Sequence, residues 1–101
     1  MKISKIIESP KLTKRYRVIM DTGDHFDFGL DGGSTYLDHH DKNKREAYWK
    51  RHFGNPKEHH LILNITPSSA LFSAMLLWGE STSLRENMNT LNKLFASKGS
   101  K

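Results

Sequence analysis

One segment of this chain constrains its fold more than any other. Residues 70–78 are apolar on nearly every side of a helix and contain no charged side chain. Such a helix is stable in water only when other elements cover it all round. Thr66 as N-cap, Pro67 at the first helical position and Gly79 as the terminating residue predict a helix over residues 68–78. The sequence therefore predicts this helix as the buried centre of the domain.

The N-terminal third carries strand patterns. Residues 2–7 alternate and are β-branched, which predicts a short edge strand that ends before Ser9-Pro10. Residues 15–20 and 25–28 flank Asp21-Thr22-Gly23-Asp24, a pattern typical of a β-hairpin. One face of the hairpin then carries the core residues Tyr16, Val18, Met20, Phe26 and Phe28. The other face carries the polar residues Arg15, Arg17, His25 and Asp27, with Arg17 opposite Asp27 across the strands.

Helical patterns dominate the rest of the chain. Residues 29–34 superficially resemble a phosphate-binding loop, but they lack its lysine and its spacing and therefore predict a turn. Asp38 or Asp41 is the expected N-cap of a helix over 42–53. A capping box at Ser83 and Glu86 predicts a helix over 83–96, with Leu84, Met88, Leu91 and Phe95 on its apolar face.

Two segments give weaker patterns. Residues 57–65 are expected to form an irregular or extended bridge, in which Leu61–Leu63 is either a short strand or a buried loop. Residues 97–101 are expected to be a frayed tail. The sequence thus predicts a single α+β domain over residues 1–101, mainly β in 1–30 and mainly α in 38–96. Its small antiparallel sheet, the hairpin plus one strand, packs against about three helices.

The net charge of +5 is the sum of opposed blocks. Residues 1–20 hold six Lys or Arg against one Glu, residues 21–41 hold six Asp and no cation, and residues 42–57 again hold six cations against one Glu. This layout favours a module with distinct basic and acidic faces over a uniformly basic DNA coat. The candidate contacts for nucleic acid or for an acidic partner are Lys42, Lys44, Arg45, Lys50 and Arg51. Tyr48, Trp49 and Phe53 interleave with these cations, and Trp49 is interpreted as a core anchor in preference to a base-stacking residue.

The chain has no cysteine, which excludes disulfides, thiolate catalysis and zinc sites built on Cys. Metal binding therefore rests on the histidines and their acidic neighbours, without any established ligand spacing. We expect no metal, no cofactor and no catalytic residue. A small metal-dependent nuclease stays as an alternative, with Arg45 and Arg51 stabilising phosphate charge. The candidate metal-binding residues are Asp38, His39, His40, Asp41, His52, His59 and His60.

The order of several short motifs is similar to that of a family of small, uncharacterised basic proteins of nucleocytoplasmic large DNA viruses, which include iridovirus-, marseillevirus-, chlorovirus- and mimivirus-like agents. The family often has an Arg two residues before the Leu-Leu-Trp step, where this chain has Ala74-Met75, so no role tied to that Arg carries over. The motifs are Lys14-Arg15-Tyr16-Arg17-Val18, Phe28-Gly29, Tyr36 with His39 and Asp41, Arg45-x-x-Tyr48, Arg51-His52, Leu76-Leu77-Trp78-Gly79 and Ser83-Leu84.

The resemblance implies a virion setting. The expected function is that of a non-enzymatic structural protein, a minor capsid or internal virion protein that contacts other virion proteins and is capable of self-association. Its expected location is the virion and the interior of the infected cell, without membrane insertion. A basic protein bound to the viral genome is the first alternative, and the nuclease is the second.

Overall fold

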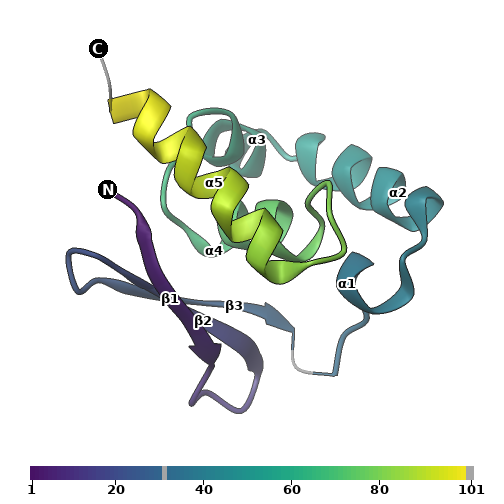
Figure 1. The fold of residues 1–101 in the computed structure, drawn as a ribbon. Coiled ribbons are helices and arrows are strands. Elements are labelled where there is room, and N and C mark those ends of the chain that lie inside the picture. The colour runs from purple at the N-terminus through teal and green to yellow at the C-terminus, as the bar shows by residue number, and fades with distance from the viewer. Residues whose placement is uncertain (31, 100–101) are drawn as a thin grey trace.

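A computed structural model describes residues 1–30 and 32–99 (Figure 1). The chain begins with three antiparallel strands in the order β1-β2-β3, as the sequence predicts. In the β2–β3 hairpin, the N–H of Gly23 donates to the carbonyl of Met20 at 3.0 Å, and the φ of +92° at Gly23 suits glycine. The strands are β1 (Ile3–Glu8), β2 (Lys14–Met20) and β3 (His25–Leu30).

The helices follow the sheet along the chain and lie together on one side of it (Figure 1). The α+β class is therefore confirmed, although the helices are more numerous than the three expected. Within the described residues, no helix combines the length and the apolar character needed to cross a membrane. The helices are α1 (Tyr36–His39), α2 (Lys42–Phe53), α3 (Pro56–Leu63), α4 (Ser69–Phe72), the π-helix η1 (Ser73–Leu77) and α5 (Leu84–Gly99).

Residues 70–78, which the sequence predicts as the buried centre of the domain, do lie at its core. Leu71, Phe72 and Leu76 in α4 and η1 have no solvent exposure. They pack in one cluster with residues of the inner sheet face and with the apolar face of α5. The strands contribute Ile3, Val18, Met20 and Phe28, and α5 contributes Leu91 and Phe95.

The predicted N-cap of the central helix is wrong by two residues. Ser68, and not Thr66, is the N-cap, because its side-chain oxygen accepts a hydrogen bond from the N–H of Leu71 at 3.2 Å. The helix changes to a π-helix at Ser73, a rare form that no residue pattern announces. Gly79 does follow the helix, and it is required by space: a Cβ there would lie 2.3 Å from the carbonyl oxygen of Met75.

The prediction of a bridge over residues 57–65 is also wrong, because α3 occupies most of this segment. Asn55 caps α3 by accepting hydrogen bonds from the N–H groups of Lys57 and Glu58, and Pro56 stands at the first helical turn. Leu61–Leu63 is thus neither a strand nor a loop. Ile62 is buried with Tyr48 and Ala74 in a second cluster that joins α3 to α2 and η1.

The expected frayed tail is helical as far as it is described. α5 continues to Gly99, and residues 100–101 lie outside the described residues. At its other end only half of the predicted capping box forms: Ser83 Oγ accepts from the N–H of Glu86, whereas Glu86 Oε2 accepts from the hydroxyl of Ser81. In its middle, Asn92 Oδ1 accepts from the N–H of Ile3 at 2.7 Å and Asn92 Nδ2 donates to the carbonyl of Ile3 at 3.2 Å.

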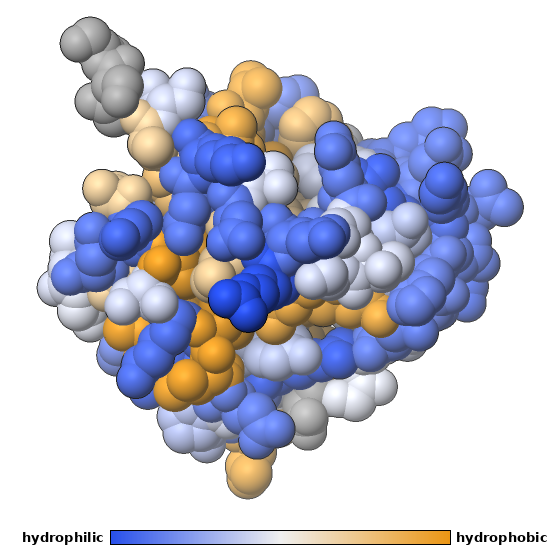
Figure 2. All heavy atoms as spheres, viewed as in Figure 1, coloured by the Kyte–Doolittle hydropathy of each residue, from blue (hydrophilic) through white to orange (hydrophobic). Residues whose placement is uncertain are grey.

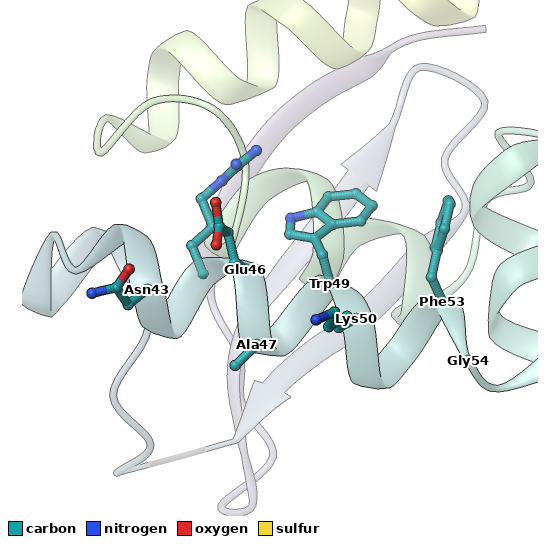
Figure 3. Close-up of a pocket in the computed structure, with 8 residues that line it drawn as sticks. Asn43, Glu46, Ala47, Trp49, Lys50, Phe53 and Gly54 are labelled. Atoms are coloured by element: carbon teal, nitrogen blue, oxygen red, sulfur yellow. The ribbon is translucent and has the colours of Figure 1, made fainter.

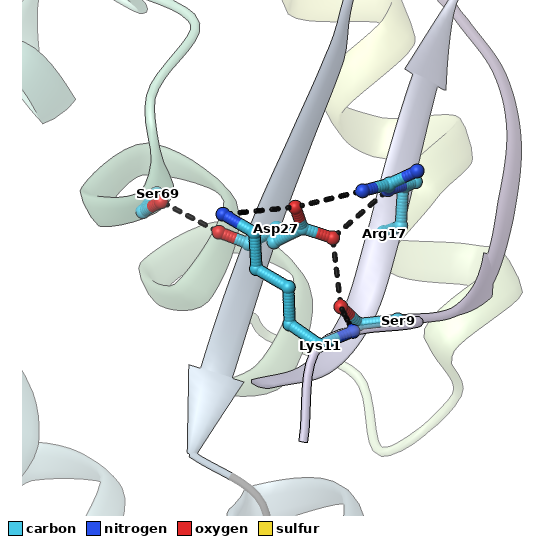
Figure 4. Close-up of polar contacts among 5 residues, drawn as sticks. All are labelled: Ser9, Lys11, Arg17, Asp27 and Ser69. Carbon is cyan, nitrogen blue, oxygen red and sulfur yellow. Dashed lines mark hydrogen bonds and ion pairs between the residues drawn. The ribbon is translucent and has the colours of Figure 1, made fainter. Parts of the chain in front are cut away.

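The outer face of the sheet holds a network around Asp27 (Figure 4). The expected pair with Arg17 forms, with Nε–Oδ1 and Nη2–Oδ2 distances of 2.9 and 3.1 Å. Ser9 donates its hydroxyl to Oδ1 at 2.7 Å, and Lys11 Nζ lies 3.6 Å from Oδ2. Ser69 in α4 donates to the backbone carbonyl of Asp27 and so fixes β3 to the central helix. The acidic block of the sequence is therefore not simply an acidic face, because the preceding basic block neutralises part of it.

This network predicts a dependence of stability on pH. The hydrogen bonds from Arg17 and Ser9 hold the pKa of Asp27 far below its usual value near 4. The carboxylate therefore stabilises the fold fully above that usual value and progressively less as the pH falls below it. We expect Asp27→Asn to be less stable than the parent at pH 7, with a difference that shrinks between roughly pH 4 and pH 2.

Urea unfolding followed by circular dichroism at each pH measures this difference. Asp24→Asn, in the exposed hairpin loop, is the matched control and is expected to have little effect at any of these pH values. A deficit in Asp27→Asn that stays constant down to pH 2 would contradict the ionic role of Asp27.

Candidate binding surface on helix α2

α2 is placed by its cap and by one buried ring. Asp41 Oδ1 accepts hydrogen bonds from the N–H groups of Asn43 and Lys44, so Asp41 is the N-cap. Asp38 belongs instead to α1 and forms a two-bond ion pair with Arg15, at 2.7 and 2.8 Å. Tyr48 is the buried residue of α2, and burial raises the pKa of its hydroxyl. The opposite side of α2 consequently faces solvent.

Four cations of α2 are exposed to solvent. Lys42, Lys44, Lys50 and Arg51 are all exposed, and none of them forms an ion pair with another described residue. Figure 2 shows hydrophilic surface over α2 at the right of the view. In the sheet, Arg15 and Arg17 are neutralised by Asp residues, whereas Lys5 and Lys14 form no ion pair with another described residue. α2 thus offers a partner four exposed cations that no described residue neutralises.

Arg45 does not share this exposed position. Its Nε donates to the carbonyls of Trp78 and Gly79, at 3.1 and 2.8 Å, and its guanidinium lies 5.8 Å from the ring centre of Tyr36. Trp49 Nε1 donates to the same carbonyl of Trp78 at 2.7 Å. Arg45 and Trp49 therefore hold α2 against the end of η1. Trp49 is an anchor, as the sequence indicates, whereas the geometry gives Arg45 a structural role that was not foreseen.

This difference predicts unequal costs for two neighbouring substitutions. Arg45→Ala removes charged hydrogen bonds to two carbonyls and is expected to lower the free energy of unfolding by about 1.5–3 kcal/mol. Lys44→Ala, one residue earlier on the exposed side, is expected to change it by less than about 0.5 kcal/mol. Chemical unfolding of both variants measures the difference. Equal effects would place Arg45 among the surface cations after all.

A shallow groove of about 800 Å³ runs along one flank of α2 (Figure 3). Trp49 and Phe53 project from the same side of the helix, one turn apart, and both are half-buried. Lys50 and Glu46 supply charges of opposite sign along the groove. The full lining consists of Asn43, Arg45, Glu46, Ala47, Trp49, Lys50, Phe53 and Gly54. Apolar rings and a free cation thus lie together on one open surface.

A comparison with known protein families finds a match in the part of the chain that includes most of α2. Residues 4–52 match a family of unknown function (DUF5754). The match runs from β1 through nearly all of α2, so it includes the exposed cations. No curated protein and no solved structure matches the chain.

The candidate metal-binding residues lie apart and contact different groups. Asp38 and Asp41 serve the ion pair and the cap described above, and His39 Nδ1 accepts from the N–H of Asp41 at 2.9 Å. His40 Nε2 lies 3.1 Å from the carbonyl oxygen of Leu37. In the part of the chain that the structure describes, no three His, Asp or Glu residues gather closely enough to hold a metal ion.

Of the remaining candidate histidines, His60 is exposed with its Nδ1 3.2 Å from Asn64 Nδ2, and the other two pack against aromatic rings. His52 stacks on Tyr48 with ring centres 4.1 Å apart and is bound through Nδ1 to Glu58 at 2.9 Å. His59 stacks on Phe53 at 4.4 Å. Sequence reasoning missed these contacts because it did not recognise α3. The Asn55-Pro56 pair was the available signal, since it ends one helix and begins the next.

Proposed function

We propose that this protein is a non-enzymatic structural protein of a large DNA virus particle, a minor capsid or internal virion protein, that binds an acidic protein partner through α2. The viral setting rests on the family resemblance of the sequence. The binding mode rests on one observation: the groove beside Trp49 and Phe53 is also lined by Lys50, a cation that no described carboxylate neutralises. The apolar part of such a surface provides affinity, and the charges select the partner.

A protein partner suits this surface better than a DNA backbone. A phosphodiester backbone offers charge but no apolar side chain to fill a groove of this size. Trp49 is also a poor base-stacking residue, because its ring is half-buried and its N–H is bound to Trp78. An amphipathic segment with large apolar residues and with Asp or Glu at its edge satisfies both the rings and Lys50.

Purified particles of the encoding virus provide the direct test. Quantitative mass spectrometry is expected to detect the protein at a fixed copy number per particle. A carbodiimide then joins lysine amines to carboxylates that touch them, and we expect Lys44 or Lys50 to be joined to Asp or Glu of another virion protein. Lys5, exposed on β1, is the internal control and is expected to be joined less. Absence from the particles would end the structural proposal.

The DNA-binding alternative separates by its dependence on salt. A gel-shift titration with duplex DNA at about 50 and 200 mM salt is expected to show no tight complex that salt abolishes. If the protein forms a complex that weakens steeply with salt and that Lys44→Glu and Lys50→Glu disrupt, α2 is a DNA-binding surface and the proposal of a protein partner is wrong.

A further inference from the structure

A second concave site lies on the other flank of α2. It encloses about 410 Å³ between the start of β2, the segment that leaves β3, α2 and η1. This volume lies within the range of small-molecule sites in proteins. α2 contributes Tyr48, Arg51 and His52 to it, whereas Trp49, Lys50 and Phe53 line the groove on the opposite flank. The two sites are therefore distinct.

The rim of this pocket is basic. Lys14 is brought there by strand pairing, since it lies opposite Leu30, the last residue of β3. Arg51 reaches the same pocket from the last turns of α2, and neither cation forms an ion pair with another described residue. The described lining includes no carboxylate. Two cations from separate elements thus converge on one hollow.

Aromatic and apolar residues that suit an organic group also line this pocket. Tyr48 and Trp78 form a parallel stack, with ring centres 4.5 Å apart and planes within 6°. Their position is fixed, because the carbonyl of Trp78 accepts hydrogen bonds from Arg45 and Trp49. The described lining is completed by Gly29, Leu30, Gly33, Ser34, Thr35, Ser73 and Leu77.

His52 adds an imidazole to the two cations that line the pocket. Its imidazole lines the pocket, stacked on Tyr48, and its Nδ1 is bound to Glu58. Glu58 itself is not among the described residues that line the pocket. A negatively charged group therefore meets Lys14, Arg51, an imidazole and the hydroxyls of Ser34 and Ser73.

We infer that this pocket binds a small organic phosphate of about nucleotide size, with the phosphate between Lys14 and Arg51 and the organic part toward Trp78. A phosphate carries enough charge to engage two cations and has several acceptor oxygens for the hydroxyl groups. Gly29, Leu30, Gly33 and Ser34, which also line this pocket, belong to the segment that resembles a phosphate-binding loop but lacks its lysine. The cations that its own sequence lacks come from β2 and α2.

Titrations monitored by ¹H–¹⁵N NMR test this site. AMP is expected to shift the amide signals of Gly33, Ser34 and Thr35 to saturation, whereas adenosine, which lacks the phosphate, is not. Lys14→Gln and Arg51→Gln are each expected to weaken AMP binding about tenfold or more, because each removes a charged hydrogen bond. Lys14→Arg keeps the charge and is expected to retain most of the affinity.

Two exposed cations outside the pocket provide matched controls. Lys5→Gln in β1 and Arg85→Gln in α5 remove the same charges and are expected to leave AMP binding unchanged. Equal weakening in all four glutamine variants would show attraction by net charge alone and would overturn the site. A single-stranded oligonucleotide without terminal phosphates distinguishes the source of the phosphate. If it shifted the same signals at lower concentration than AMP, the small-ligand proposal would be wrong.

Discussion

Replacing Phe72 with alanine is expected to lower the free energy of unfolding by about 3–5 kcal/mol. Phe72 has no solvent exposure, and its ring centre lies 5.4 Å from that of Phe26 and 6.0 Å from that of Phe28. Its removal therefore leaves a cavity where the central helix meets the sheet. For a domain of this size such a loss is a large part of the total stability.

Chemical denaturation of the purified variant measures this loss. Phe72→Leu keeps much of the volume and is expected to cost less, about 1–2 kcal/mol. Leu12→Ala is the control, because Leu12 is 92% exposed and its loss leaves no cavity. A loss below about 1 kcal/mol in Phe72→Ala would mean that the site collapses around the missing ring, or that the ring is not packed there.

The second large effect is expected at Asn87, which is 3% exposed on α5. Its Nδ2 donates to the carbonyls of Leu76 and Ser81, at 3.0 and 2.8 Å, and its Oδ1 accepts from the N–H of Ser81 at 3.0 Å. Asn87→Asp keeps the shape but replaces the donor with a charged acceptor that faces two carbonyls. We expect a loss of about 3 kcal/mol or more at pH 7, because a buried charge is left unpaired.

The same variant has a characteristic pH response. The new carboxyl regains a donor when it takes up a proton, so the deficit is expected to shrink as the pH falls toward about 4. Asn89→Asp, on the exposed side of the same helix, is the matched control and is expected to cost less than about 0.5 kcal/mol. Similar losses in the two variants would refute the role of Asn87 as the link between α5 and the end of η1.

Local sequence patterns predicted the elements that local interactions determine. The hairpin follows from Asp21-Thr22-Gly23-Asp24, and α2 begins where Asp41 places its cap. α3 was missed because it buries only Ile62, while Leu63 stays 65% exposed, so its apolar residues do not form a helical stripe. The π-helix depends on how residues 73–77 pack in the core, which a linear pattern does not contain.

The candidate sites likewise combine features that local sequence predicts with features that depend on tertiary packing. Exposure of Lys44 and Lys50 follows from their place on an amphipathic helix, and the sequence indicated both. The role of Arg45 depends on where the chain returns at Trp78, more than thirty residues later. Lys14 and Arg51 are likewise brought to one pocket only by the tertiary packing, since one lies in β2 and the other in α2. Charge blocks read along the chain do not show which charges neutralise one another.

The contact between Asn92 and Ile3 affects how the chain folds while it is being synthesised. The carboxamide pairs with both backbone groups of Ile3, much as a residue of a neighbouring strand would, and it lies 89 positions away. The backbone groups of Ile3 on the edge of β1 therefore leave the ribosome unpaired, and the side chain that pairs with them is synthesised 89 residues later. A growing chain is consequently exposed to pairing with other copies until α5 has emerged and docked.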